Sequence, residues 1–283
     1  MIRDEVAAER PVTVRRWDTR RVYAALIFIP LFYLVVRYLP PAAFFALVLV
    51  AAGLALVELY RLHFHGRPAP MAIAVGLVNA GLLLTHMQWP DVFSLHSVLA
   101  WIIGATLLFY LLSAHDLNQS LVDVSVLVFG ALYIGFTMGH LLLTRALPEG
   151  TFLIFFVVLV TWAGDTGAYY VGISMGRTRL APKISPQKTV EGLLGGCVLA
   201  VLMALLARLW FLPSFSFTDA VVMGITLTLA GLVGDLSESM FKRSAGVKDS
   251  GGLIPGHGGM LDRLDSLLLT APTYYYYVTL MKG

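Results

Sequence analysis

The segment PAAFFALVLVAAGLALVELY, residues 41–60, decides the fold class of this chain. Glu58 is the only charged residue among these twenty, and Pro40 immediately precedes the segment. About 20 consecutive, predominantly apolar residues are enough for an α-helix to cross the hydrocarbon core of a bilayer. The segment therefore predicts a transmembrane helix.

Similar apolar segments recur along the whole chain. Of its 283 residues, 58% are hydrophobic and 13% are charged, whereas soluble domains carry about 25% charged residues. The apolar runs are continuous rather than alternating, which argues against a β-barrel. We therefore predict an all-α, polytopic integral membrane protein with about nine transmembrane helices. The predicted spans are residues 22–39, 41–60, 71–88, 97–113, 121–143, 152–174, 190–212, 217–240 and 264–281.

The positive charges predict the orientation of these spans. Sixteen of the twenty Lys and Arg residues fall in the N-terminal tail and in loops that a cytoplasmic N-terminus would place on the cytoplasmic side. These loops are 61–70, 114–120, 175–189 and 241–263. Because cytoplasmic loops carry an excess of Lys and Arg, we expect the N-terminus in the cytoplasm and the C-terminus outside.

Three regions follow from this organisation. Residues 1–21 form a basic cytoplasmic tail, residues 22–143 form N-terminal helices that we expect to act as a scaffold, and residues 152–283 form the catalytic region. A secretory signal is an alternative interpretation of the basic start and the first apolar run. Because the polar tail is long and many spans follow, we expect a retained helix.

A strongly polar segment, DLSESMFKRSAGVKDSGGLIPGHGGMLDRLD at residues 235–265, interrupts the apolar pattern. On a helix Asp235, Ser239 and Lys242 share a face, and Glu238 lies next to it. Five glycines at residues 251–259 would let backbone N–H groups approach an anion. Acids at membrane depth usually line a functional cavity, and carboxylates suit a hard divalent ion that neutralises a polyphosphate. The alternative is that these charges are interfacial anchors, with Asp262 as a helix cap.

The run from Ser239 to Asp265 resembles, position by position, the signature of the phosphatidate cytidylyltransferases, also called CDP-diacylglycerol synthases. No position departs from the pattern. The matching elements are Ser239, Lys242 with Arg243, Lys248 with Asp249, PGHGG at residues 255–259 and DRLD at residues 262–265.

A second segment, GDTGAYYVGISMGRTRLAPKISPQKTVEG at residues 164–192, is similar to the other cytoplasmic motif of that family. The residues themselves are consistent with this resemblance, because Lys183 and Lys188 offer point charges for phosphate, and Ser185 and Thr189 offer hydroxyl groups. The alternative is that the basic residues of this loop only set the topology. The matching positions are Asp165, Gly172, Gly176, Lys183, Ser185, Pro186, Lys188, Thr189, Glu191 and Gly192.

The resemblance implies that CTP and phosphatidic acid react to give CDP-diacylglycerol and pyrophosphate. Asp235, Asp262 and Asp265 are the expected ligands of Mg²⁺, with Asp249 as a further candidate, and together with Lys242 they are the expected catalytic residues. A second, monovalent ion such as K⁺ is also compatible with the family. The expected substrate-binding residues are Lys183, Ser185, Lys188, Ser239, Arg243, Lys248, His257, Gly258, Gly259 and Arg263.

The same resemblance sets expectations about setting and partners. The lipid substrate would enter from the membrane and CTP from the cytosol, so the active site should face the cytoplasm. A bacterial inner membrane fits the compact chain, a homodimer is compatible with the family, and no nucleic-acid partner is expected.

Two alternatives stay open at this point. A CTP-dependent lipid kinase would transfer the γ-phosphate and release CDP. A transporter should show broken helices in matching halves, whereas the polar motifs here lie in the second half. Two further acids, Glu58 and Asp123, lie near predicted cytoplasmic span ends, where we expect them to cap a helix or to face the interface; the alternative is that either belongs to a cavity.

Overall fold

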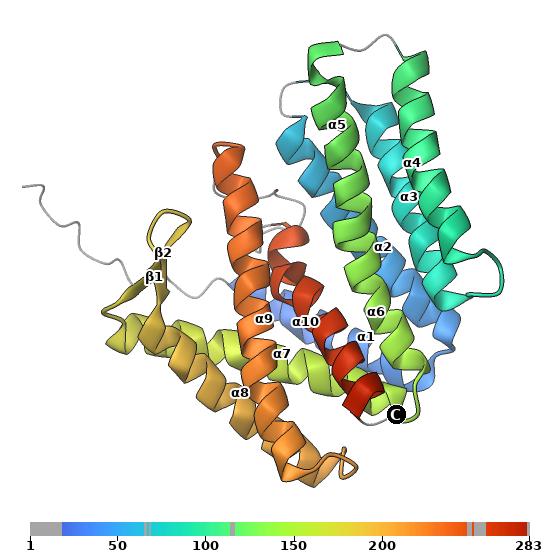
Figure 1. The fold of residues 1–283 in the computed structure, drawn as a ribbon. Helices are drawn as coiled ribbons and strands as arrows, with labels where there is room; N and C mark the ends of the chain where they lie inside the picture. The colour runs from blue at the N-terminus through green and yellow to red at the C-terminus, as the bar shows by residue number, and fades with distance from the viewer. Residues whose placement is uncertain are drawn as a thin grey trace, which may run out of the picture.

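The computed structural model describes residues 19–64, 67, 69–113, 117–247, 251 and 259–281, and these residues are almost entirely helical (Figure 1). The N-terminal half contains α1 (Thr19–Tyr38), α2 (Pro41–His63), α3 (Pro70–Gln88), α4 (Leu95–Leu112), α5 (Leu117–Gly130), the π-helical segment η1 (Ala131–Phe136) and α6 (Thr137–Ala146). The C-terminal half contains α7 (Gly150–Met175), β1 (Arg179–Ala181), β2 (Ser185–Thr189), α8 (Val190–Trp210), α9 (Phe217–Ser244) and α10 (Leu261–Met281).

Within the described residues, seven helices are long and apolar enough to cross a membrane. Their outer surfaces are apolar, because Leu111, Leu117 and Leu209 are each at least three-quarters exposed. Large contiguous apolar surfaces of this kind mark contact with a membrane or another protein. The seven are Pro41–His63, Pro70–Gln88, Leu95–Leu112, Leu117–Ala146, Gly150–Met175, Val190–Trp210 and Phe217–Ser244.

The prediction of a polytopic helical membrane protein is therefore confirmed. All nine predicted spans coincide with helical segments. Seven of these helices are long and apolar enough to cross a membrane, α10 is not among them, and of α1 the segment Phe28–Tyr38 is an apolar helix. In α10 the apolar character is interrupted by Asp262, Arg263 and Asp265. The predicted loop 175–189 also differs, since it contains a short antiparallel β-hairpin, and the chain is not purely α-helical.

The C-terminal helices pack closely because small residues line their contacts. One face of α8 presents Gly192, Gly196, Ala200 and Ala204, which follow one another at intervals of four residues and are all buried. Small residues at this spacing let helix backbones approach in a membrane. The α8 helix packs against α7 and α9, and α10 packs mainly against α9 and α6.

The last helix lies between the two halves of the molecule. In Figure 1, α10 lies between α9 and the helices α2–α6, and α7 crosses α9 and extends to α6. Besides α9 and α6, α10 contacts α7 and α2. Side chains from both halves can therefore reach the beginning of α10.

Candidate active site

The last turns of α9 carry the first group of predicted site residues. Asp235, Ser239 and Lys242 all lie on this helix, and Ser239 Oγ is 3.5 Å from Asp235 Oδ1. The predicted common face is therefore present. Glu238, which is fully buried, lies next to it and forms an ion pair with Lys242.

A close approach of helix backbones joins α9 to α10. A Cβ atom at Gly234 would lie 2.2 Å from the carbonyl oxygen of Asp265, so only glycine fits at this position. The contact brings the acids of the two helices together. The side chains of Asp235, Asp165 and Lys188 lie near enough to the Asp265 carboxylate to influence it electrostatically.

The β-hairpin brings the second predicted segment to α9. Strand β2 leads directly into α8, whose first turn is capped by Thr189 through a hydrogen bond from Gly192 N at 3.1 Å. Just before this cap, Lys188 Nζ forms an ion pair with Asp235 Oδ2. Arg243 Nε also donates to Ile184 O in the hairpin turn at 3.4 Å. The two polar segments of the sequence therefore meet in space.

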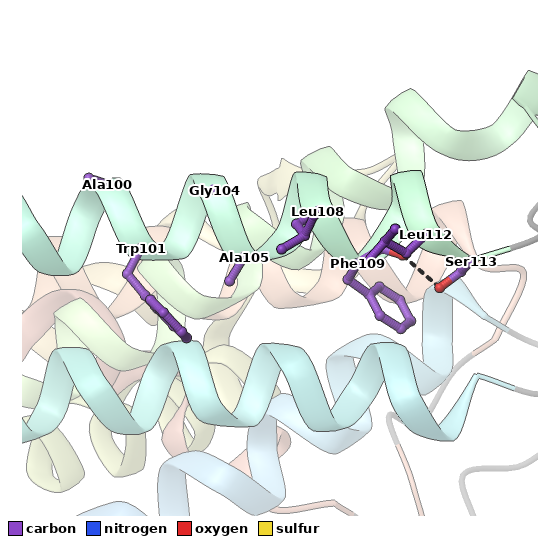
Figure 2. A pocket seen from close by; sticks show the side chains of 8 residues that line it. All are labelled: Ala100, Trp101, Gly104, Ala105, Leu108, Phe109, Leu112 and Ser113. Carbon is purple, nitrogen blue, oxygen red and sulfur yellow. Dashed lines mark hydrogen bonds between the residues drawn. The ribbon is translucent and has the colours of Figure 1, made fainter.

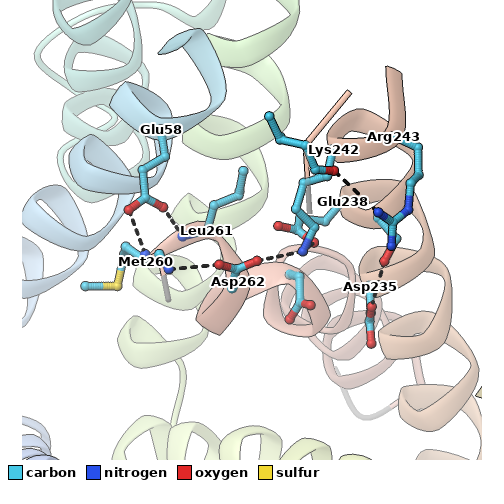
Figure 3. A network of polar contacts seen from close by, with 12 residues as sticks. Glu58, Asp235, Glu238, Lys242, Arg243, Met260, Leu261 and Asp262 are labelled. Carbon is cyan, nitrogen blue, oxygen red and sulfur yellow. Dashed lines mark hydrogen bonds and ion pairs between the residues drawn. The ribbon is translucent and has the colours of Figure 1, made fainter. Parts of the chain in front are cut away.

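A second charged cluster lies at the beginning of α10 (Figure 3). Lys242 Nζ lies 2.5 Å from Glu238 Oε2 and 2.6 Å from Asp262 Oδ1. The other oxygen of Asp262 accepts a hydrogen bond from Gly259 N at 2.8 Å. Asp262 is therefore an ion-pair partner of Lys242 and also ties the residue before the helix to its first turn, but it lies within α10 and is not its N-cap.

Glu58 is a site residue that the sequence analysis did not assign to the site. It lies on α2 and is buried, and its oxygens accept hydrogen bonds from Met260 N at 3.0 Å and Leu261 N at 2.8 Å (Figure 3). The expected capping role is correct, but the capped helix is α10 rather than a neighbour in sequence. The only sequence signal was an acid within an otherwise apolar span.

Asp165 also belongs to this region, although we predicted no role for it beyond its place in the motif. It lies on α7, and its Oδ1 accepts a hydrogen bond from Ser266 Oγ at 3.3 Å. The carboxylate of Asp235 and the ammonium group of Lys188 both act on it. The structure thus places three carboxylates, those of Asp165, Asp235 and Asp265, in the same region as Lys188.

Other predicted residues are more peripheral. Lys183 and Arg263 are exposed, and Ser185 is half-buried in β2. Gly259 directs its N–H toward Asp262, so in this structure that group is occupied by a carboxylate rather than open to a phosphate. Four predicted residues, Lys248, Asp249, His257 and Gly258, lie outside the described part of the chain.

No preformed metal cage is present: across the described residues, no three His, Cys, Asp or Glu side chains are arranged to hold a metal ion. Magnesium, however, usually takes only one or two protein carboxylates and completes its shell with water and phosphate oxygens. Asp235 and Asp265, on adjoining turns of α9 and α10, meet this smaller requirement. The residues present therefore fit a magnesium ion that binds together with a phosphate substrate.

A hollow of about 470 Å³ lies elsewhere, along α4 (Figure 2). Its walls are almost entirely apolar, and Trp101, Leu108 and Leu112 are more than half exposed there. It lacks the charged groups that a nucleotide requires. We therefore assign the candidate site to the polar clusters of α9 and α10.

Comparison with known proteins shows which family the chain resembles. Residues 19–281 match the cytidylyltransferase family. The chain is 36% identical over 268 residues to a phosphatidate cytidylyltransferase of Bacillus subtilis, which covers 92% of this chain and 96% of that protein. It is also 36% identical to the Synechocystis protein of that name, over 93% of this chain and 97% of the relative. For the Staphylococcus aureus protein the identity is 38%, over 70% of this chain and 75% of the relative.

Proposed function

Because the chain belongs to the cytidylyltransferase family, we propose that it is a phosphatidate cytidylyltransferase, which converts CTP and phosphatidic acid to CDP-diacylglycerol and pyrophosphate. The near full-length match to relatives of that name is the observation that carries the proposal. The convergence of Lys188, Asp235 and Asp265 on one site supports it.

The reaction places particular demands on the site. An oxygen of the lipid phosphate attacks the α-phosphorus of CTP, a new P–O bond forms, and the bond to the β-phosphate breaks to release pyrophosphate. Because the attacking oxygen is already anionic, no strong base is needed. The site must instead align two negatively charged phosphates and offset their repulsion.

The basic residues suit this task. Lys242 is held between Glu238 and Asp262, so its ammonium group is fixed at the beginning of α10. Lys188 is held by Asp235, and Arg243 lies one residue beyond Lys242 on α9. We assign these three cations to the phosphates of CTP and the lipid. The further predicted ligands Lys183, Ser185, Ser239 and Arg263 stay predictions, as do Lys248, His257, Gly258 and Gly259.

Magnesium is the ion that we propose for this site. Asp235 and Asp265 would hold it, with Asp165 nearby, and it would supply positive charge to the phosphate oxygens. Asp262, which we also predicted as a ligand, pairs with Lys242 and accepts from Gly259 N in this structure. Asp235 is likewise paired with Lys188, so Asp262 stays a predicted ligand that also orients Lys242. Asp249 and a second, monovalent ion stay predictions.

We further propose nine membrane crossings, in which α1 and α10 join the seven apolar helices. With the N-terminus in the cytoplasm, the hairpin and the junction between α9 and α10 lie on the cytoplasmic side, as the excess of Lys and Arg requires. Location in a bacterial inner membrane and a homodimeric assembly are proposals that rest on the family.

A labelling experiment tests the function. Purified protein in detergent, given phosphatidic acid, magnesium and CTP labelled at the α-phosphate, should transfer label into a chloroform-soluble lipid. CTP labelled at the γ-phosphate should release label only as water-soluble pyrophosphate. Label from the γ-phosphate in the lipid would instead identify a kinase, and label in neither lipid would refute both enzymatic functions.

The magnesium assignment makes a separate prediction. Asp265→Asn should raise the magnesium concentration needed for half-maximal turnover by at least about tenfold, because one of two carboxylate ligands is lost. Asp91→Asn, an exposed acid in the loop between α3 and α4, serves as the matched control and should leave this concentration unchanged. An unaltered magnesium dependence in Asp265→Asn would remove this residue from the metal site.

A further inference from the structure

Glu58 occupies an unusual position for an acid. It lies in α2, one of the most apolar helices of the chain, and only 1% of its surface is exposed. A buried carboxylate costs several kcal/mol unless hydrogen bonds or opposite charges compensate it. Its presence there calls for specific partners, and these lie more than 200 residues further along the chain.

The partners are backbone N–H groups at the beginning of α10. The first N–H groups of a helix have no partner within the helix, and the helix dipole makes this end positive. Glu58 Oε1 accepts from Met260 N at 3.0 Å, and Oε2 accepts from Leu261 N at 2.8 Å. Both oxygens of one side chain are thus used to fix the first turn of α10 against α2.

A third neighbour of the Glu58 carboxylate is Gly251, at the start of the glycine-rich segment. A Cβ atom at Gly251 would lie 3.0 Å from Glu58 Oε1 and 3.2 Å from its carboxyl carbon, so the backbone of Gly251 lies directly against the carboxylate. Glu58 therefore lies beside Gly251, which precedes the motif PGHGG, and accepts a hydrogen bond from Met260, which immediately follows it.

The turn that Glu58 holds is also the turn that carries Asp262. Asp262 follows Leu261 directly, and it holds both Gly259 N and the Lys242 ammonium group. A shift of Met260 and Leu261 would move Asp262, and with it Lys242 and the Glu238 carboxylate that shares this cation. Figure 3 shows this sequence of contacts from Glu58 through Asp262 to Lys242.

We propose that Glu58 is a positioning residue for the cytidylyl transfer, and that it acts from the N-terminal half by fixing the first turn of α10. This inference rests on the proposed function. It assigns a role in the reaction to helix α2, which the sequence analysis treated as scaffold. Because Glu58 contacts the backbone rather than the phosphates, its loss should affect kcat more than KM.

The principal test is Glu58→Gln in the full-length protein in detergent. The amide keeps the length of the side chain but replaces one acceptor with a donor, which faces a backbone N–H. Loss of a residue that orients an active-site ligand commonly reduces activity about 10–100-fold. We expect kcat per folded molecule to fall by that factor, with KM for CTP and phosphatidic acid within about twofold of the wild type, and amide exchange at Met260 and Leu261 to become faster.

Glu149→Gln is the matched control, because Glu149 is exposed and lies in the short loop before α7. It should change neither kcat nor amide exchange. The proposal is overturned if Glu58→Gln retains kcat within about twofold of the wild type. It is also overturned if the total activity of the variant falls only in proportion to the amount of folded protein.

A second variant covers the case in which Glu58→Gln does not fold. Gly251→Ala leaves the carboxylate in place but puts a methyl group against Oε1, so kcat should again fall, whereas Gly104→Ala should have no effect because its Cβ would meet no atom within 4 Å. Wild-type kcat in Gly251→Ala would then overturn the proposal. If the wild-type protein makes no labelled lipid, the proposed function is wrong whatever the variants show. Unaltered amide exchange at Met260 and Leu261 in Glu58→Gln would instead refute the contact between Glu58 and the first turn of α10.

Discussion

Lys188 pairs with one carboxylate and lies near two others, and this arrangement determines how its substitutions should behave. It forms an ion pair with Asp235 and acts on Asp165 and Asp265. Without Lys188 the three acids would repel one another at a partly buried site, where like charges are poorly screened. The residue thus has a structural task within the free protein in addition to its proposed contact with phosphate.

We predict that Lys188→Ala lowers kcat by at least about 100-fold, the loss that accompanies removal of one transition-state charge partner in other enzymes. Arg179→Ala is the matched control, because Arg179 is an exposed base of the same hairpin. The α-labelled CTP assay measures both variants. If Lys188→Ala and Arg179→Ala had equal activities, the basic residues of the hairpin would set the membrane topology and would not bind phosphate.

Among the elements, α10 is the one on which the site depends most. It supplies Asp262 and Asp265, and it is held by Glu58 at its first turn and by Gly234 one turn further along. The contact with Glu58 consists of hydrogen bonds, whereas at Gly234 the backbones of α9 and α10 approach each other with no side chain between them. Together they fix both the rotation of α10 and its distance from α9.

We predict that Gly234→Ala separates α9 from α10, because its methyl group would lie 2.2 Å from the Asp265 carbonyl oxygen, which cannot move aside as a flexible side chain could. The melting temperature and kcat per folded molecule should both fall. Gly104→Ala, an identical change on a helix surface with no neighbouring atom, is again the control. Wild-type stability and activity in Gly234→Ala would contradict the close approach.

The arrangement of the whole molecule follows from its two halves and the helix between them. Helices α7–α9 bring together most of the charged site, and α2 reaches the same region through α10. The site lies at the ends of α9 and α10 where the hairpin projects beyond α8 (Figure 1). In the proposed function a nucleotide approaches this end from solvent while the lipid remains in the bilayer.

The proposed orientation can be tested with single cysteines. The sequence contains one cysteine, Cys197, so a Cys197→Ser background permits labelling at chosen sites. In intact cells or right-side-out vesicles, an impermeant thiol reagent should label Asp91→Cys, in the loop between α3 and α4, but not Arg179→Cys in the hairpin. Permeabilised membranes should allow both to react, and the reverse pattern in intact vesicles would invert the topology.

Much of the fold was available from the sequence. Every predicted span coincides with a helix because the hydrophobicity of a run of residues is a local property, and a bilayer requires helices of a given length. Asp235, Ser239 and Lys242 were placed correctly on one face because helical periodicity is also local. The hairpin at residues 179–189 was missed because its strands are short and polar and carry no alternating apolar pattern.

The sequence by itself determined the membrane fold class and, through the family motifs, predicted the residues that act on phosphate. Only the tertiary structure decided that Asp262 holds Lys242, that Asp165 joins Asp235 and Asp265, and that Glu58 caps a helix more than 200 residues away. The physical reason is that hydrophobicity and periodicity depend on neighbours along the chain. The partner of a buried charge depends instead on which helices pack together.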